Sequence, residues 1–395
     1  MNKQKIVVVG GAGHVGLPLA LALADKGFPT VALDVNLNHL EQIKSGISPF
    51  LEDGINEYLK RSLLNGNFTV TSDSLTLLDA EVIIVVVGTP VDEFLSPDPN
   101  HVVNTCRELT QYMRNGQLLI LRSTLFPGVT RNIEKVLAEE KLNIDVAYCP
   151  ERILQGKALR EIQDLPQIIG ARTEFVADRV KSIFMHLNHN LQISSPEEAE
   201  LAKLFTNAWR YMKFAISNQF WMISNDLEVD YKNVMNLVTK DYPRASDLPG
   251  PGLTAGPCLF KDTMQLAATL SHNFPLGNAA MMINEGLPSY IVKRLKTKYE
   301  LDKMTVGILG AAFKAEVDDI RGSLSYKLRK SLKFECRNVL MSDPFVKDLR
   351  LVPMGQLIED SDLIIIATPH TSYLGLEINK PIVDVWDVLG RGLLI

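Results

Sequence analysis

Cysteine is scarce in this sequence, because only Cys106, Cys149, Cys258 and Cys336 occur among 395 residues and no two form a CxxC pair. This spacing excludes a disulfide framework and a cysteine-ligated structural zinc, and it favours a reducing compartment, by default the cytoplasm. Long apolar runs are also missing. The longest, such as residues 82–87, are far too short to cross a bilayer, and no signal peptide or anchor is visible. We therefore expect no membrane partner.

Blocks of lysine and arginine are missing too, and the net charge of -5 argues against nucleic acid as a partner. The seven histidines show no metal-ligand spacing, so we expect no metal site. What is present is an ordinary globular composition, with 46% hydrophobic and 22% charged residues. A chain of this length can form two or three domains with substantial cores.

A glycine-rich turn follows the first strand-like run. Residues 5–10 lead directly into Gly11-Ala-Gly-His-Val-Gly16 and then into a helical pattern at residues 17–26. These glycines permit a tight turn and close approach of a pyrophosphate to the helix N-terminus. A second strand, residues 29–33, ends in Asp34, which can bind both ribose hydroxyls and would repel a 2′-phosphate. The pattern favours NAD over NADP, although a glycine turn that binds nothing is the alternative.

Further strand-like runs separated by helical stretches predict a doubly wound parallel α/β sheet, at residues 81–87, 118–121 and 145–147. Polar residues follow each run, at the strand ends where such sheets place their ligands. Thr89, Thr124 and Glu151 are thus expected to converge on one crevice. Taken singly, each has a structural interpretation, as a turn residue, a helix N-cap and a surface acid.

A long helix is predicted after a domain boundary near residue 190. Ser195-Pro-Glu-Glu198 carries the signature of a helix start, and residues 199–224 contain no proline or glycine. Apolar residues occupy more than one face, which predicts burial on several sides, in a crossing between domains or in pairing with a second copy. Glu200, Lys203 and Asn207 share one polar stripe. Spacing alone favours a solvated face for them.

The last third of the chain has the rhythm of a second, partial Rossmann-like domain. Residues 303–310 form a strand that enters a glycine turn, and further strand-like runs follow, at residues 338–341, 363–368 and 382–385. GxxGxA replaces GxGxxG here, so the segment is not a true repeat. Two nucleotide-type folds flanking a helix make two nucleotides the natural expectation.

Cys258 lies in a glycine-rich loop, with Lys261 and Asp262 three and four positions later. A thiol of pKa near ~8.5 is only slightly ionised at neutral pH, and a neighbouring ammonium favours the nucleophilic thiolate. The alternative is an inert cysteine that packs as a small hydrophobe. The loop alone does not decide between them.

Together and in this order, the motifs resemble those of the UDP-glucose/GDP-mannose dehydrogenase family over essentially the whole chain, namely GAGHVGLPLA, GxxPFxExGI around Glu52, VGTP, STLFPG, CPER, the Lys203/Asn207 helix, the cysteine loop, AFK-DDIR and TPH. ILQGKA after Arg152, Tyr-Pro-Arg244 and Asp318-Asp319 are most similar to the branch that acts on UDP-N-acetylhexosamines, typically UDP-N-acetylmannosamine. The resemblance implies a Rossmann NAD-binding domain in residues 1–190, a central long-helix dimerisation domain in 191–298, and a Rossmann-like UDP-sugar-binding domain in 299–395.

The activity that the resemblance implies is a four-electron oxidation of the sugar C6 alcohol to a carboxylate, with two NAD reduced in succession. Cys258 would form a thiohemiacetal and then a thioester. Lys203 would stabilise the oxyanion at C6, while Asn207 and Asp262 would hold that oxygen or a water. Glu151 would act as general base for thioester hydrolysis, and Thr124 would position a water.

The same resemblance implies the binding residues. NAD contacts are expected at Gly11, Gly13, His14, Val15, Gly16, Asp34, Thr89, Thr124, Lys261 and Arg321. UDP-sugar contacts are expected at Glu151, Arg152, Ile153, Leu154, Lys203, Asn207, Arg244, Gly252 and Lys314. Arg244 would come from the other subunit of a homodimer. One departure is the loop Thr254-Ala-Gly-Pro257, which is a residue longer than usual and lacks the family's two adjacent glycines. A UDP-glucose dehydrogenase and a catalytically silent NAD/UDP-sugar-binding protein stay open as alternatives.

Overall fold

The computed structural model describes residues 3–89, 98, 100–254, 256–269 and 273–395. The described chain forms two compact units, Met1–Thr206 and Asn207–Ile395. The proposed division into three domains at residues 190 and 298 stays a prediction. Within the described residues, none of the helices combines the length and the apolar character that crossing a membrane would need.

In its described part, the first unit contains an eight-stranded sheet in the order β3-β2-β1-β4-β5-β6-β7-β8. Its strands are β1 (Ile6–Val9), β2 (Thr30–Leu33), β3 (Phe68–Thr71), β4 (Val82–Val85), β5 (Leu118–Leu121), β6 (Asp145–Tyr148), β7 (Gln167–Ala171) and β8 (Leu191–Ser194). The pairs from β3 to β6 are parallel, which confirms the predicted doubly wound arrangement. Sequence reasoning missed β3, β7 and β8, and it also missed that β7 runs antiparallel to β6.

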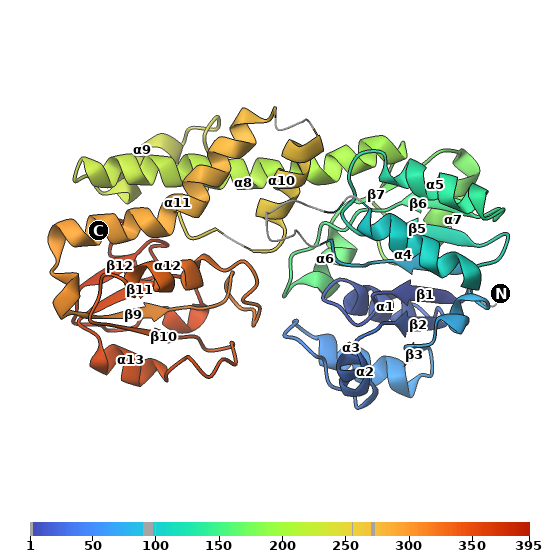
Figure 1. The fold of residues 1–395 in the computed structure, drawn as a ribbon, viewed down its shortest axis with the longest axis horizontal. Helices are drawn as coiled ribbons and strands as arrows, with labels where there is room; N and C mark the ends of the chain where they lie inside the picture. The colour runs from blue at the N-terminus through green and yellow to red at the C-terminus, as the bar shows by residue number, and fades with distance from the viewer. Residues whose placement is uncertain (1–2, 90–97, 99, 255, 270–272) are drawn as a thin grey trace. The chain divides into compact units, whose positions relative to one another are not determined.

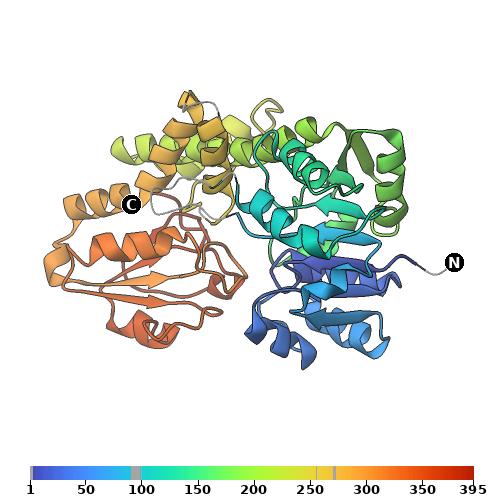
Figure 2. The same ribbon diagram turned by 45° about the vertical axis from the view of Figure 1, so that its right-hand side comes forward.

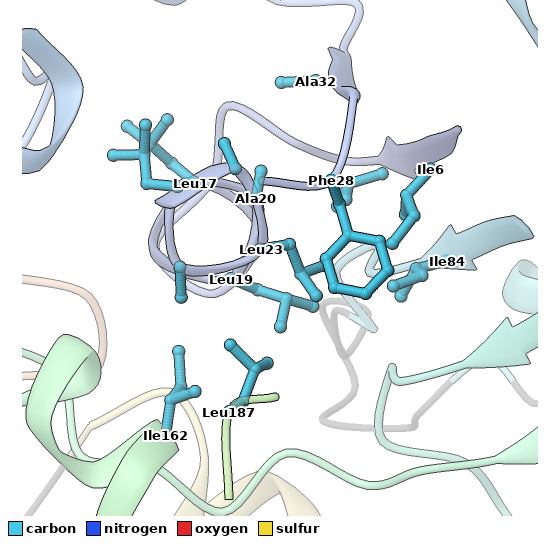
Figure 3. Close-up of a cluster of buried hydrophobic side chains, with 14 of the residues drawn as sticks. Ile6, Leu17, Leu19, Ala20, Leu23, Phe28, Ala32, Ile84, Ile162 and Leu187 are labelled. Carbon is cyan, nitrogen blue, oxygen red and sulfur yellow. The ribbon is translucent and has the colours of Figure 1, made fainter. Parts of the chain in front are cut away.

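Helices cover both faces of this sheet (Figure 1), namely α1 (Gly16–Asp25), α2 (Leu37–Lys44), α3 (Ile55–Leu64), α4 (His101–Leu109), α5 (Val129–Glu139), α6 (Ala158–Asp164) and α7 (Glu174–Phe184). Two hydrophobic clusters result, because alternate residues of a strand point to opposite faces. Ile6 and Val8 of β1 belong to one cluster, Val7 and Val9 to the other. Figure 3 shows the first, in which Leu19 and Leu23 of α1 pack near Phe28 and Ile84.

Helix α8 (Pro196–Asp226) begins in the first unit and continues into the second. The predicted start is confirmed, because the Ser195 hydroxyl accepts from the Glu198 amide (3.3 Å) and the Glu198 carboxylate accepts from the Ser195 amide (2.8 Å). The predicted burial on several sides leaves one face of the helix open in the single chain, and pairing of that face with a second copy stays a prediction. A row of large apolar residues along α8 and just past its end is 44–70% exposed in the single chain, namely Phe205, Trp209, Ile216, Phe220, Ile223 and, directly after the helix, Leu227.

The second unit continues with α9 (Tyr231–Thr239), α10 (Leu259–Thr269) and α11 (Pro275–Lys298). A parallel sheet of four strands follows among the described residues, in the order β10-β9-β11-β12, with bounds β9 (Thr305–Leu309), β10 (Asn338–Ser342), β11 (Leu363–Ile366) and β12 (Ile382–Asp384). Figure 2 shows this sheet between α12 (Leu324–Leu332) and α13 (Met354–Asp360), which pack on opposite faces. The predicted Rossmann-like strands are thus confirmed.

Candidate active site

The glycine loop after β1 is held by packing at three positions. Gly10 has φ +79°, and an added Cβ would lie 2.3 Å from the Val86 carbonyl oxygen. A Cβ on Gly11 would lie 2.6 Å from Ala32 Cα, and one on Gly16 would lie 2.1 Å from the Gly10 oxygen. Gly11 and Gly16 therefore serve the tight turn and the close helix–strand packing that the motif predicts. The need for Gly10 was missed, because it precedes the GxGxxG spacing.

Gly13 is different, and it supports a dinucleotide. Of the described atoms, its added Cβ would come within 4 Å of the Gly10 oxygen alone, at 3.4 Å, so the chain itself leaves room for a side chain. Close approach of a pyrophosphate explains the glycine. Asp34 follows β2, as predicted, and its two oxygens accept from the amides of Ala12 (3.0 Å) and Asn36 (2.9 Å). Each oxygen keeps a second lone pair for a ribose hydroxyl. These residues fit NAD.

The rest of the NAD loop is anchored by local contacts. The His14 ring packs against Phe50 with centroids 4.1 Å apart, and its Nδ1 lies 3.2 Å from Gln155 Nε2. Val15 is half-buried where α1 begins. His14 is therefore already engaged by its own chain.

Two neighbouring strand ends carry the predicted crevice threonines. Thr89 follows β4 and Thr124 follows β5, and both are half-buried. The Ser123 hydroxyl donates to the Val87 carbonyl at 2.8 Å, so it ties the two loops together. Residues 90–97, which include the end of the VGTP motif, lie outside the described residues.

Glu151 follows β6 and is tied into its own loop. Its carboxylate pairs with the Arg122 guanidinium and accepts from the amides of Arg152 (2.7 Å) and Ile153 (2.9 Å). Arg122 is buried and also donates to the Cys149 carbonyl at 3.1 Å. The surface-acid interpretation of Glu151 is wrong, because its side chain is only 11% exposed. Sequence reasoning missed Arg122, whose position directly after β5 was the available signal.

The expected UDP-sugar contacts beside Glu151 are partly used within the chain. The Ile153 amide donates to Glu151, and the Leu154 amide donates to Glu161 at 2.6 Å. Because both amides are used within the chain, Ile153 and Leu154 can offer a ligand only their backbone carbonyl groups. The Arg152 guanidinium donates to a backbone carbonyl, that of residue 166, and burial lowers the pKa of Arg152 although Glu151 opposes this.

The polar stripe of α8 is buried, so the solvated-face interpretation is wrong. Glu200, Lys203 and Asn207 are at most 8% exposed. Asn207 Nδ2 donates to Asp262 Oδ2 at 2.6 Å, which joins α8 to α10 across 55 positions of sequence. The Asp262 side chain is fully buried, and its Oδ1 lies 3.2 Å from Lys261 Nζ. Lys261, expected to contact NAD, therefore forms an ion pair with Asp262.

Cys258 is exposed and directly precedes α10. Its carbonyl accepts from the Asp262 amide at 2.8 Å, so the thiol belongs to the first turn. The partial positive charge of a helix N-terminus and the nearby Lys261 both favour a thiolate. The inert-packing alternative required burial. In this chain Cys106 and Cys149 have that environment, and burial raises the pKa of each to about 12.

The unusual loop before Cys258 has a packing requirement at Gly256. This residue has φ +112°, and an added Cβ would lie 2.5 Å from the Phe313 ring. Gly252 is similar, because its Cβ would lie 2.3 Å from the Trp386 ring, and Asn218 holds its amide at 2.8 Å. Ala255 lies outside the described residues. Packing within the second unit thus accounts for both glycines, including the one expected to contact substrate.

The remaining expected contacts lie in the second unit. Arg321 donates to both oxygens of the buried Asp319, at 2.6–3.0 Å. Lys314 is half-buried in the turn after β9. Arg244 is exposed in the segment after α9, with its guanidinium 5.7 Å from the Tyr242 ring centroid.

Sequence reasoning missed that Asp343, after the second strand of the C-terminal sheet, anchors the neighbouring loop through hydrogen bonds within the chain. Gly310 and Asp343 follow β9 and β10, as Gly10 and Asp34 follow β1 and β2, and Gly310 has φ +99°. Asp343 Oδ2 accepts from the amides of Ala311 (2.7 Å) and Ala312 (2.9 Å) and lies 3.1 Å from His370 Nε2. Both side chains of the Asp343–His370 pair are fully buried. The sequence signals were an acid directly after a strand-like run, in Ser342-Asp-Pro344, and the TPH motif.

The Asp343 anchor predicts an acid-dependent loss of stability. Burial alone would raise its pKa, but hydrogen bonds from His370 and from backbone amides outweigh this and lower the pKa from 3.8 to about 2. The carboxylate therefore stabilises the fold above pH 4, and this contribution, about 2 kcal/mol, is lost as the pH falls from about 4 to 2. We expect Asp343→Asn to have a lower free energy of unfolding in urea than the wild type at pH 7, and we expect this difference to shrink toward pH 2. A difference in the free energy of unfolding that stays constant with pH would contradict the stabilising role of the Asp343 carboxylate.

Comparison with known proteins agrees with this arrangement. Three models of the UDP-glucose/GDP-mannose dehydrogenase family match in order, the NAD binding domain at residues 4–188, the central domain at 197–286 and the UDP binding domain at 307–391. The UDP-N-acetyl-D-mannosamine dehydrogenase of Methanocaldococcus jannaschii is 30% identical over 408 aligned positions, which cover 98% of this chain and 94% of that protein.

Solved structures agree as well. That of a UDP-D-ManNAc dehydrogenase from Pyrococcus horikoshii has a TM-score of 0.90 at 26% identity, covering 98% of this chain and 97% of that one. That of a UDP-glucose dehydrogenase from Pyrobaculum islandicum has a TM-score of 0.89 at 27% identity, covering 97% and 94%. The chain therefore belongs to the UDP-glucose/GDP-mannose dehydrogenase family, whose members are NAD-dependent nucleotide-sugar dehydrogenases.

Proposed function

We propose that this enzyme oxidises the C6 hydroxyl of a UDP-N-acetylhexosamine to the uronic acid, with UDP-N-acetyl-D-mannosamine as the first choice and UDP-N-acetylglucosamine as the second. The observation that carries the proposal is Cys258, an exposed thiol directly before α10, whose first turn carries Lys261 and the buried Asp262 that pairs with Asn207. An ordinary alcohol dehydrogenase needs no nucleophile. The named mannosamine relatives support the choice of sugar.

The chemistry balances as two oxidations and one hydrolysis. When bound at Gly13 and Asp34, NAD supplies the hydride acceptor, one molecule for each oxidation. The C6 alcohol loses a hydride and a proton to become an aldehyde. The Cys258 thiolate then forms a C–S bond to its carbon while the C=O π bond breaks and the oxygen takes up a proton, which gives a thiohemiacetal. Loss of a second hydride and the hydroxyl proton gives a thioester. Water cleaves the C–S bond, which releases the carboxylate and restores the thiol.

Each remaining group has one role in this scheme. Lys203 supplies positive charge where the C6 oxygen becomes an oxyanion. Asn207 and Asp262, fixed to each other at 2.6 Å, hold that oxygen or the attacking water. Glu151 accepts the proton of the hydrolytic water, with Arg122 holding its carboxylate in place, and Thr124 positions the water.

Two other functions are weighed against this one. A UDP-glucose dehydrogenase is favoured by the Pyrobaculum islandicum structure, which is as similar in fold as the mannosamine enzyme. A silent binding protein has no need of Cys258, Lys203, Glu151 or Asp262, and all four are present.

A substrate panel tests the proposal. NADH formation would be followed with UDP-N-acetylmannosamine, UDP-N-acetylglucosamine, UDP-glucose, UDP-galactose and GDP-mannose. We expect the highest kcat/KM with UDP-N-acetylmannosamine and two NADH for each sugar. A preference for UDP-glucose would support the first alternative, and activity on none of the five would support the silent protein.

We also propose that the active unit is a homodimer formed along the exposed row of α8, in which Arg244 enters the partner's site. Five large apolar residues spaced along α8, with Leu227 directly after it, expose a surface that a second copy would cover. We expect Phe220→Asp to convert the dimer to a monomer in sedimentation velocity. The control, Leu237→Asp, alters an exposed residue of α9 outside the row. A dimer that persists in Phe220→Asp contradicts the proposed interface.

Complementation tests the sharing of Arg244. In a co-expressed mixture of Arg244→Ala and Cys258→Ser, each mixed dimer would hold one site with both changes and one site with neither. Random pairing then restores about a quarter of the wild-type activity. If Arg244 acts within its own subunit, every site keeps one defect and no activity returns.

A further inference from the structure

Glu200 is a buried acid that the proposed reaction does not use. It lies on α8, three residues before Lys203, and is fully buried. Its Oε2 accepts from the Gly128 amide at 2.6 Å, and its Oε1 accepts from the Thr130 amide (2.8 Å) and the Thr130 hydroxyl (2.6 Å). All three donors belong to the start of α5, some 70 positions earlier in the sequence.

These bonds replace a local helix cap. Gly128, at the N-cap of α5, has φ +92° and offers no side chain to the first turn. A serine, threonine or aspartate at the N-cap would satisfy such amides without burying a charge from another element. Burying a carboxylate is costly unless its hydrogen bonds are made, so the long-range cap is the more demanding solution. Capping of α5 alone therefore does not explain why a buried glutamate from α8 is used instead of a local N-cap side chain.

What the cap adds is a connection between two parts of the proposed site. The loop between β5 and α5 carries Thr124, and it is fastened at both ends within the first unit. Ser123 holds its beginning to Val87, and Glu200 holds its end to α8. Residues three apart on a helix share a face, so the same turn of α8 presents both Glu200 and Lys203.

We propose that Glu200 is a positioning residue that keeps the Thr124 loop in register with Lys203, an inference that rests on the roles given to those two residues in the proposed function. A displacement of about 1 Å in reacting groups can cost roughly 100-fold in rate. Glu200 acts through the loop and touches neither the sugar nor NAD.

The test compares Glu200→Gln with changes at Thr130. Glutamine keeps the size, but its NH₂ group cannot accept a hydrogen bond, so at least one donor of α5 loses its partner. We expect kcat to fall about 10- to 100-fold while KM for the sugar changes less than about threefold. Thr130→Ser keeps all three hydrogen bonds to Glu200, so its kcat should match the wild type. Thr130→Val loses one of these bonds, so its kcat should lie between those of the wild type and Glu200→Gln. A wild-type kcat in Glu200→Gln, even with a lowered Tm, overturns the proposal.

A second readout needs no sugar. Hydrogen exchange would be measured with and without NADH for peptides that cover residues 122–130 and 196–206. In the wild type we expect NADH to slow hydrogen exchange in both peptides. In Glu200→Gln we expect NADH to slow exchange only in the peptide that covers residues 122–130. Coupled protection that survives in Glu200→Gln overturns the proposal. If the wild type oxidises no sugar yet shows coupling that Glu200→Gln loses, the proposed function fails and the positioning role stands.

Discussion

Replacing Cys258 by serine is expected to stop the reaction at the aldehyde. A serine hydroxyl is far less acidic than a thiol, so neither the start of α10 nor Lys261 can convert it to a comparable nucleophile. We expect overall turnover to fall by about 10⁴-fold or more, the scale seen when a catalytic nucleophile is removed. In a single-turnover experiment, one NADH and an aldehyde-level sugar would appear instead of two NADH and the acid.

The matched control is Cys336→Ser. Cys336 is half-buried, and burial raises the pKa of this thiol to about 11, so its loss should leave the stoichiometry at two NADH. Full turnover with two NADH per sugar in Cys258→Ser would exclude the covalent route. A loss of NADH binding in Cys258→Ser would instead point to a structural role for the loop.

Replacing Lys203 by alanine is expected to lower kcat more than it raises KM. The lysine is buried on α8, where a positive charge fixed near a developing oxyanion acts with little screening from water. Removing one such group typically costs 10²- to 10³-fold in rate, or roughly 3 kcal/mol of transition-state stabilisation. Steady-state kinetics over a range of UDP-sugar concentrations separates the two parameters.

Lys181→Ala provides the comparison for lost positive charge. Lys181 lies on α7, where its ammonium pairs with Asp178 at 2.8 Å, and its removal should leave kcat within about twofold. If Lys203→Ala raises KM and keeps kcat, the lysine binds the ground state and the transition state equally, and the oxyanion role is wrong.

Local patterns were sufficient for much of the fold. The buried strands β1, β4 and β5 are continuous apolar runs, β2 is apolar after Thr30, and the ends of these strands carry the turn residues that the sequence shows. The start of α8 was equally readable, because a capping box involves residues only three positions apart. By contrast, β8 has the sequence LQIS and is half-exposed, so its place depends on pairing with β7 rather than on hydrophobicity.

The site was less predictable wherever distant segments decide it. Spacing placed Glu200, Lys203 and Asn207 on one face of a helix, but burial of that face depends on α5 and α10. Arg122 was missed for a similar reason, because its partner Glu151 lies 29 positions later. Long-range partners of this kind have no periodic signal.

The Asp343–His370 pair fixes the acid of the C-terminal sheet to its own chain, whereas the acid of the N-terminal sheet, Asp34, keeps lone pairs for a ligand. Both sheets place an acid after the second strand of the motif, yet Asp343 spends its lone pairs on the amides of Ala311, Ala312 and residues 345–346 and on a buried imidazole. Bonds within the chain thus account for the acid after the second strand of this sheet, without a ligand at Asp343. For anyone redesigning this enzyme to accept a second dinucleotide, His370 is the first residue to change.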